Sequence, residues 1–340
     1  MALRPNVWRG VFLRVTMVLV LGLAIVTLLV YSREERMQGQ QQQREHPITM
    51  EINLRGDGKP PPLAPNNVTC SNVLRWLPPN AVDSNLLVVQ VVNEPYLKVQ
   101  KNFMALMAKN SPSTKDSLYL LCLDRKSMTV MASMGVHCVQ VDGIIADSGN
   151  KDAVWLIRMK VLECLLKDSR DVLMSDNDAV WLKNPIPELL KIEGDLLVQR
   201  APWPPETADP VFGVTMCMGF ALFRSGGEGM TKFQSEVDRL LHETGDDQVS
   251  VNRVAAALEP DFDYATSDMR YQASTAVGRC VLKGLQGTFR VGYLPHNKYT
   301  RDCDATPVSD DTIVAHCHTW GPVERRISTM KKNGVWVLDN

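Results

Sequence analysis

Apolar runs alternate with amphipathic segments between residues 86 and 175. The apolar runs are short and rich in Leu, Val and Met, as is typical of strands buried on both faces. They span residues 86–92, 118–123, 136–141 and 171–175. The segments between them have apolar residues at helical spacing and span residues 96–108, 126–134 and 151–167. This alternation predicts an α/β fold with a doubly wound, mostly parallel sheet and right-handed crossovers.

The periodicity is weaker after residue 187, but it still indicates further strands and helices. The expected strands span residues 195–199, 219–223 and 312–315. The expected helices span residues 229–242, 245–258 and 324–332, and the last of them is basic. We expect this half of the chain to build the second substrate site.

The N-terminus contains an uncharged apolar run at residues 15–31. Its 17 residues would form a helix about 25 Å long, close to the roughly 30 Å hydrocarbon core of a bilayer. Arg4, Arg9 and Arg14 precede the run, so residues 1–14 should stay cytoplasmic and the rest of the chain should be lumenal. A cleaved signal peptide is the alternative, but no small-x-small cleavage site follows the run. The pattern favours a single-pass type II membrane anchor.

Residues 32–82 are rich in Gln, Pro and charged side chains and have few large apolar ones. Such a segment cannot bury a core, so we expect an extended or disordered stem. It contains the N-glycosylation sequon at Asn67, on the predicted lumenal side. Residues 83–340 remain for one large catalytic domain.

Charge and cysteine content narrow the function further. The formal net charge is -1, and no basic stripe with interleaved aromatic residues occurs, which argues against a nucleic-acid partner. All eight cysteines follow the apolar run, and an even number in an oxidising lumen permits up to four disulfides without indicating which cysteines pair. No C-x-x-C pair is present, which argues against a zinc knuckle or a thioredoxin-like centre.

Two carboxylates, Asp176 and Asp178, follow the expected strand at 171–175. Side chains two residues apart in extended backbone point the same way, so both could face one ion. Carboxylate oxygens suit Mg²⁺ or Mn²⁺, which keep positions open for substrate phosphates. The structural alternative is a solvated acidic turn, because Asp is a favoured turn residue.

Other polar residues are expected near this pair. Asn93 follows the first strand, and ligands of such sheets bind outside the carboxyl ends of the strands. His316 or His318 could complete the metal shell, and Arg325 or Arg326 could bind a diphosphate, although either histidine could also be structural. Asp246 and Asp247 at the start of a helix could be capping residues or functional ones.

A set of motifs, in order along the chain, resembles glycosyltransferase family 77, the rhamnogalacturonan xylosyltransferase-like and arabinosyltransferase-like enzymes. The set comprises Asn93-Glu94-x-Tyr96, Leu123-Asp124, Lys160, residues 175–185, Gly219-Phe220, Asp247-Gln248, residues 316–321 and Trp336. The family's usual Asn before Gly-Phe is Met218 here, and His318 replaces an Asn. The resemblance implies a GT-A fold, a nucleotide-sugar donor, a divalent cation, retention of configuration and a Golgi location.

Position and resemblance together assign roles to the candidate residues. We expect Mn²⁺ or Mg²⁺ to act as a Lewis acid on the leaving diphosphate of a UDP-pentose or UDP-hexose, with a glycan or glycoprotein as acceptor. The expected metal ligands are Asp176, Asp178 and His316; the expected diphosphate contacts are Lys160 and Arg325 or Arg326; the expected nucleoside contacts are Asn93 and Tyr96; and Asp247 is expected to orient sugar hydroxyls or shield the oxocarbenium-like centre.

Two alternatives compete with this hypothesis. Asp176-x-Asp178 also fits haloacid-dehalogenase-type phosphatases, in which the first Asp would be the nucleophile. That motif normally ends the first strand of its core, whereas three expected strands precede it here. The other alternative is a membrane-tethered sugar-binding protein that keeps the fold without turnover.

Overall fold

The computed structural model describes residues 68–78, 81, 85–141, 151–201, 213–262, 277–285, 289–304, 307–319 and 321–338. All of them belong to one compact unit, Pro60–Asn340. The predicted anchor at 15–31 and the sequon at Asn67 lie outside the described residues. Within the described ranges, no helix has both the length and the apolar character needed to cross a bilayer.

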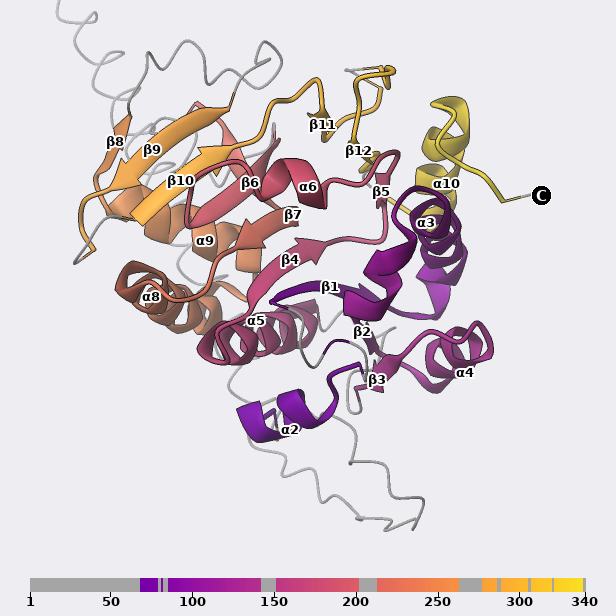
Figure 1. Cartoon of the computed structure of the whole chain (residues 1–340), viewed down its shortest axis with the longest axis horizontal. Helices are drawn as coiled ribbons and strands as arrows, with labels where there is room; N and C mark the ends of the chain where they lie inside the picture. Colours follow the sequence, from indigo (N-terminus) through magenta and orange to yellow (C-terminus); the bar gives the residue numbers. More distant parts are fainter. Residues whose placement is uncertain are drawn as a thin grey trace, which may run out of the picture. The chain divides into compact units, whose positions relative to one another are not determined.

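A nine-stranded sheet forms the centre of the described part of the molecule (Figure 1), in the order β3-β2-β1-β4-β7-β6-β10-β9-β8. Its strands are β1 (Leu86–Val92), β2 (Leu118–Cys122), β3 (Cys138–Gln140), β4 (Asp171–Ser175), β6 (Leu196–Ala201), β7 (Thr215–Phe223), β8 (Pro260–Phe262), β9 (Gly278–Leu282) and β10 (Phe289–Tyr293). The first four are parallel, as predicted, with Leu86 opposite Asp171. The second half is mixed: β7 is antiparallel to both β4 and β6, whereas β10 is parallel to β6.

Helices cover both faces of this sheet, because alternate strand residues point to opposite sides. Leu87 and Val89 of β1 belong to one apolar cluster, and Val88 and Val92 belong to the other. The helices are α3 (Leu97–Asn110), α4 (Arg125–Ser133), α5 (Lys151–Lys167), α6 (Ile186–Leu189), α8 (Glu228–Thr244), α9 (Asp247–Ala257) and α10 (Val323–Lys332), with 3-10 turns at Glu94–Tyr96 (η3) and Pro112–Ser117 (η4).

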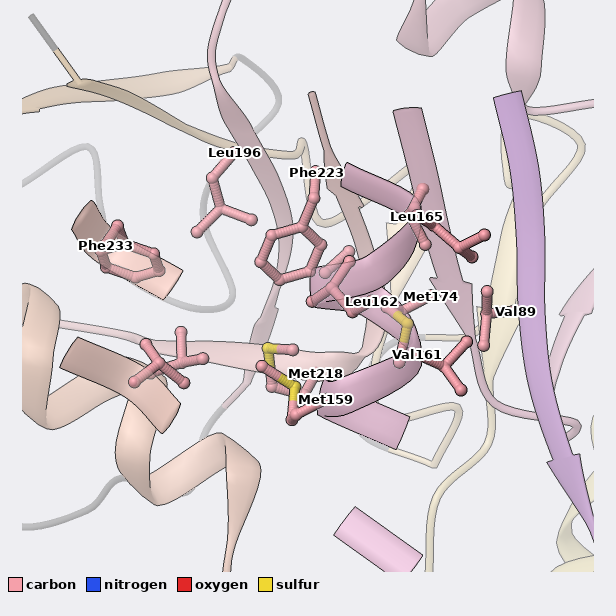
Figure 2. Packing of buried hydrophobic residues seen from close by; sticks show 14 of the residues in the cluster. Val89, Met159, Val161, Leu162, Leu165, Met174, Leu196, Met218, Phe223 and Phe233 are labelled. Atoms are coloured by element: carbon pink, nitrogen blue, oxygen red, sulfur yellow. The ribbon is translucent and has the colours of Figure 1, made fainter. Parts of the chain in front are cut away.

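Helix α5 supplies the central side chains of the first cluster. Figure 2 shows Met159, Leu162 and Leu165 of this helix beside Met174 of β4 and Phe223 of β7. Burying an aliphatic side chain of this size contributes about 1.5–3 kcal/mol. The packing therefore fixes α5 firmly against the strand that leads to Asp176.

A second sheet brings the C-terminal part of the chain to the residues after β4. Its strands are β11 (Tyr299–Thr300), β12 (Val314–His316) and β5 (Ala179–Trp181), in the order β11-β12-β5. Strand β12 is antiparallel to β5, with His316 opposite Ala179. This pairing places His316 beside the Asp pair although about 140 residues separate them in sequence.

The folded unit begins before Asp83, so the predicted stem boundary at residue 82 needs correction. Helix α2 (Cys70–Arg75) starts at the cap residue Thr69, whose side chain accepts a hydrogen bond from the Asn72 amide. Val73 is fully buried, and a disulfide joins Cys70 to Cys164 of α5. These contacts attach the end of the Pro-rich segment to the folded domain, which its composition does not predict. The other disulfides are Cys122–Cys138 and Cys303–Cys317.

Candidate active site

A tight turn between β4 and β5 carries the Asp pair. The Asp176 amide donates to the Gly219 carbonyl of β7 at 2.7 Å, and the Ala179 amide donates to the Asp176 carbonyl at 3.0 Å. The Asp176 side chain is 35% exposed, whereas that of Asp178 is 2% exposed. A fully buried carboxylate must be paired or bound to a metal, so Asp178 does not fit the alternative of a solvated turn.

Asp176, Asp178 and His316 form a cluster suited to a cation. One ligand atom from each lies within 4.8 Å of the others, and Asp178 Oδ1 is 3.2 Å from His316 Nε2. Asp178 Oδ2 and His316 Nε2 are buried and make no hydrogen bond. Oxygen and nitrogen ligands of one Mg²⁺ or Mn²⁺ lie about 3 Å apart, given bonds of about 2.1 Å. The residues present therefore fit a divalent cation.

The His316 ring is held in the orientation that a ligand needs. Gln199 of β6 donates from Nε2 to the Thr300 carbonyl at 2.7 Å, so its Oε1 faces His316 Nδ1 as an acceptor at 3.0 Å. Nδ1 therefore carries a proton, and Nε2 faces Asp178; metal-binding histidines are commonly oriented in this way. Burial alone lowers the pKa of His316, but Asp178 raises it to about 9. Burial opposes the charge on Asp178, and Arg326 and His316 hold its pKa well below the ordinary range.

Gly219 makes room for this cluster on the β7 side. A Cβ at this position would lie 2.3 Å from His316 Cε1 and 2.7 Å from Asp176 Oδ2. The preceding residue, Met218, points the other way into the hydrophobic core beside Met159 (Figure 2). The Gly-Phe motif therefore has a steric role here, and the Met218 departure falls in the core.

Arg158 of α5 connects Asp176 to Asp247. Its Nη1 donates to Asp176 Oδ1 at 2.8 Å, its Nε donates to Asp247 Oδ2 at 2.9 Å, and its Nη2 pairs with the same Asp247 oxygen. Burial raises the pKa of Asp247, against the opposing effect of Arg158. The guanidinium also lies 4.5 Å from the centre of the Trp155 ring. The sequence analysis missed Arg158, although its position is unusual for a charged residue. It lies three residues after Trp155 and four before Leu162, on the helix face expected to be apolar.

The two acidic residues at the start of α9 have separate roles. Asp246 is the cap, and its Oδ1 accepts from the Val249 amide at 2.8 Å. Asp247 is 3% exposed and points to Arg158. Gln248 accepts a hydrogen bond from the Met218 amide, which ties the start of α9 to β7.

On the other side of the cluster, α10 brings Arg326 to Asp178 and Tyr96. Arg326 Nη1 lies 3.0 Å from Asp178 Oδ2 and donates to the Tyr96 hydroxyl at 3.2 Å. Burial raises the pKa of Tyr96, and the adjacent Arg326 partly offsets this. Asn93 follows β1 and is the cap residue of the η3 turn that contains Tyr96. The structure thus brings together the predicted residues Asp176, Asp178, His316, Tyr96, Arg326 and Asp247.

Three predicted residues stand outside these contacts. Lys160 Nζ lies 2.5 Å from Glu163 Oε2. Lys160 comes two residues after Arg158 in α5, so the two side chains lie on different faces of the helix. Arg325 is exposed on α10. His318 lies 6.1 Å from His316 between ring centres and outside the ligand cluster, and burial lowers its pKa to about 3.

A family model described as nucleotide-diphospho-sugar transferase matches residues 115–321, a range that includes every member of the Asp-Asp-His cluster. No curated protein matches the chain.

Several solved glycosyltransferase structures are similar to this chain at low sequence identity. The apo-form GlyE from Streptococcus pneumoniae TIGR4 is 16% identical, with a TM-score of 0.32, over 48% of this chain and 41% of that chain. The galactosyltransferase LgtC in complex with donor and acceptor sugar analogs is 13% identical, with a TM-score of 0.37, over 74% and 97% of the two chains. Mouse xyloside xylosyltransferase 1 is 10% identical, with a TM-score of 0.35, over 56% and 83%. The chain therefore spans less than half the length of the first of these structures.

Proposed function

The chain belongs to the nucleotide-diphospho-sugar transferase family, and on this premise we propose that it transfers a sugar from a nucleotide-diphosphate donor at the cluster of Asp176, Asp178 and His316. The family implies a nucleotide-sugar donor, which places a diphosphate leaving group in the reaction. The observation that carries the proposal is the convergence of two carboxylates and an oriented imidazole, with buried ligand atoms that make no hydrogen bond.

The proposed reaction places negative charge on the diphosphate as the sugar departs. A divalent cation bound by Asp176, Asp178 and His316 would act as a Lewis acid on that group. The Arg326 guanidinium lies 3.0 Å from Asp178 and would neutralise further charge on the phosphates. Tyr96 and Asn93, at the carboxyl end of β1, would contact the nucleoside.

Arg158 and Asp247 hold the opposite side of the proposed site. Arg158 fixes the orientation of Asp176, since it bonds one carboxylate oxygen at 2.8 Å. Asp247 would contact sugar hydroxyls while its ion pair with Arg158 keeps it from acting as a free base. This arrangement supports transfer with retention, for which no inverting general base is needed. We leave Lys160 out of the proposed site because its ammonium group is paired with Glu163.

The finer assignment rests on the resemblance to glycosyltransferase family 77. We propose Mn²⁺ or Mg²⁺ as the cation, a UDP-pentose or UDP-hexose as donor, and a glycan or glycoprotein as acceptor. We further propose a single-pass type II protein of the Golgi membrane, anchored through residues 15–31 with a lumenal catalytic domain. Three disulfides among the described residues support an oxidising compartment.

The test is metal-dependent release of nucleotide from a panel of UDP-sugars by the purified full chain. Asp178→Asn should fold but lose about 100-fold or more of the activity, because a Lewis acid on the leaving group contributes several kcal/mol. Asp261→Asn is the matched control, since the Asp261 side chain is 59% exposed and forms a surface ion pair with Lys283.

Two results would contradict the proposal. Full metal-dependent turnover by Asp178→Asn would remove the proposed role of the cluster. Release of phosphate from simple esters, with an aspartyl-phosphate at Asp176, would instead identify a phosphatase.

A further inference from the structure

Arg326 connects three separate parts of the candidate site. Its side chain is 12% exposed and reaches from α10 to Asp178, whose side chain is 2% exposed. Nη1 also donates to the Tyr96 hydroxyl at 3.2 Å, and Nη2 donates to the Thr319 carbonyl at 3.1 Å. The guanidinium therefore bridges the proposed metal ligand and the proposed nucleoside contact.

The contact between Arg326 and Asp178 has the character of a charge pair. Nη1 and Oδ2 lie 3.0 Å apart, yet Oδ2 and Arg326 Nε are both buried atoms without a hydrogen bond. The other carboxylate oxygen faces His316 Nε2. One oxygen of Asp178 thus faces a permanent cation of the chain itself, and the other faces an imidazole nitrogen.

A divalent cation on Asp178 would lie next to the Arg326 guanidinium. Like charges only a few Å apart repel strongly where water is excluded, because the effective dielectric constant is low. The carboxylates of the cluster and of Asp247 supply three negative charges, and Arg158 and Arg326 already supply two positive ones. A metal ion alone therefore leaves an excess of positive charge in a buried site.

A nucleotide diphosphate removes this excess. It brings at least two negative charges, and a guanidinium binds phosphate oxygens with paired hydrogen bonds. Arg326 then has a new partner, and Asp178 becomes available to the metal. Metal and diphosphate would each favour the binding of the other, and thermodynamic linkage requires the two effects to be equal.

We propose that Arg326 is an internal counter-cation that opposes metal binding at Asp178 until a diphosphate is present, so that metal and donor enter this site together. The inference rests on the proposed function, because it takes Asp178 as a metal ligand. It adds a binding order to that function. The enzyme retains little metal between turnovers, and the metal site is filled only when the donor binds.

The experiment measures Mn²⁺ binding to the purified full chain from the signal of free Mn²⁺ in electron paramagnetic resonance, with and without UDP. The wild type should bind Mn²⁺ weakly alone and more tightly with UDP. Arg326→Gln should bind Mn²⁺ alone more tightly than the wild type does, by about 5- to 150-fold, the usual range of coupling between sites. In this variant UDP should bind more weakly and should raise Mn²⁺ affinity less.

Two further variants separate charge from shape and from general effects on the helix. Arg326→Lys keeps the positive charge and should keep Mn²⁺ binding weak in the absence of UDP. Lys332→Gln removes one positive charge from the same helix at a side chain that is 70% exposed, and it should behave like the wild type.

The possible failures are distinguishable. If Arg326→Gln binds Mn²⁺ alone no more tightly than the wild type, while Asp178→Asn loses Mn²⁺ binding with UDP present, this inference is overturned and the proposed metal site stands. If Asp178→Asn binds Mn²⁺ like the wild type, the proposed function itself is overturned. If Arg326→Gln does not fold, Mn²⁺ binding to the wild type still tests the inference. Equally tight binding with and without UDP would contradict it.

Discussion

Replacement of Gly219 by alanine tests whether the shape of the metal cluster is set by β7. Gly219 lies on the strand directly behind Asp176 and His316, and its carbonyl accepts the Asp176 amide at 2.7 Å. The added methyl group would lie 2.3 Å from His316 Cε1 and 2.7 Å from Asp176 Oδ2. Ordinary contact begins at 3.4 Å, so the imidazole must move by about 1.1 Å (3.4 minus 2.3) and the carboxylate by about 0.7 Å (3.4 minus 2.7).

Neither group can move freely. His316 is 1% exposed and is held between Gln199 and Asp178, and Asp176 is bonded to Arg158. Overpacking of this kind lowers the free energy of unfolding by about 1–3 kcal/mol. A displacement of about 1 Å at a reacting centre reduces the rate by about 100-fold. Gly219→Ala should therefore fold, bind Mn²⁺ and UDP poorly, and lose about two orders of magnitude in turnover.

The assay combines thermal unfolding, Mn²⁺ binding in the presence of UDP, and nucleotide release by the full chain. Gly227→Ala is the matched control, since a Cβ there would have no neighbour closer than 3.9 Å and the backbone φ is -98°. Wild-type Mn²⁺ affinity and turnover in Gly219→Ala would refute the reasoning, because the cluster would then tolerate a shift that its geometry forbids.

Two further predictions concern the charges around the cluster. Arg158→Met leaves Asp247 buried without its partner and should lower the free energy of unfolding by about 3–5 kcal/mol in denaturant titrations, with part of the loss recovered in the double variant with Asp247→Asn; an unchanged midpoint for Arg158→Met would contradict this. The pKa of His316 is raised from 6.5 to about 9, so its pair with Asp178 stabilises the metal-free fold fully below pH 6.5 and loses this contribution as the pH rises through about 9. The stability difference between wild type and Asp178→Asn in chelator should accordingly shrink between pH 6.5 and 9.5, and a difference that grows with pH would contradict the assignment.

The parallel half of the fold was predictable because its signals are local. Strands β1 and β4 and helix α5 lie at the predicted residues 86–92, 171–175 and 151–167. Each is a continuous apolar or amphipathic segment whose periodicity matches its structure. The Asp pair at the end of β4 follows from the same reasoning, since the end of a parallel strand is a common ligand position.

In the second half the sequence predicted strands near β6, β7 and β12 and helices near α8, α9 and α10. It did not predict how these strands pair, because the pairing depends on contacts between distant segments. Strands β8, β9 and β10 form the far edge of the sheet without a continuous apolar pattern, and β5 has only three residues. The pairing of β5 with β12 joins residues more than 130 positions apart. Neither local periodicity nor turn chemistry specifies such a pairing.

Arg158 shows a different limit of sequence reasoning. It lies on a stripe otherwise made of apolar residues, where a charged side chain is an exception that requires a partner. The stripe was recognised, but the partner could be identified only with α9 in place, because Asp247 lies 89 residues away in sequence. A charge on the buried face of an amphipathic helix therefore indicates a buried ion pair without identifying it.

The location of the counter-charges links the folding of the domain to the formation of the site. Asp178 lies in the middle of the chain, but the cationic groups that face it, His316 and Arg326, come from β12 and α10 near the C-terminus. A buried carboxylate without these partners is strongly unfavourable, since breaking such a pair costs about 3–5 kcal/mol. The turn that holds Asp178 can therefore reach its observed conformation only after the C-terminal segment has docked. The site and the docked C-terminal segment should then form, and be lost, as one cooperative unit.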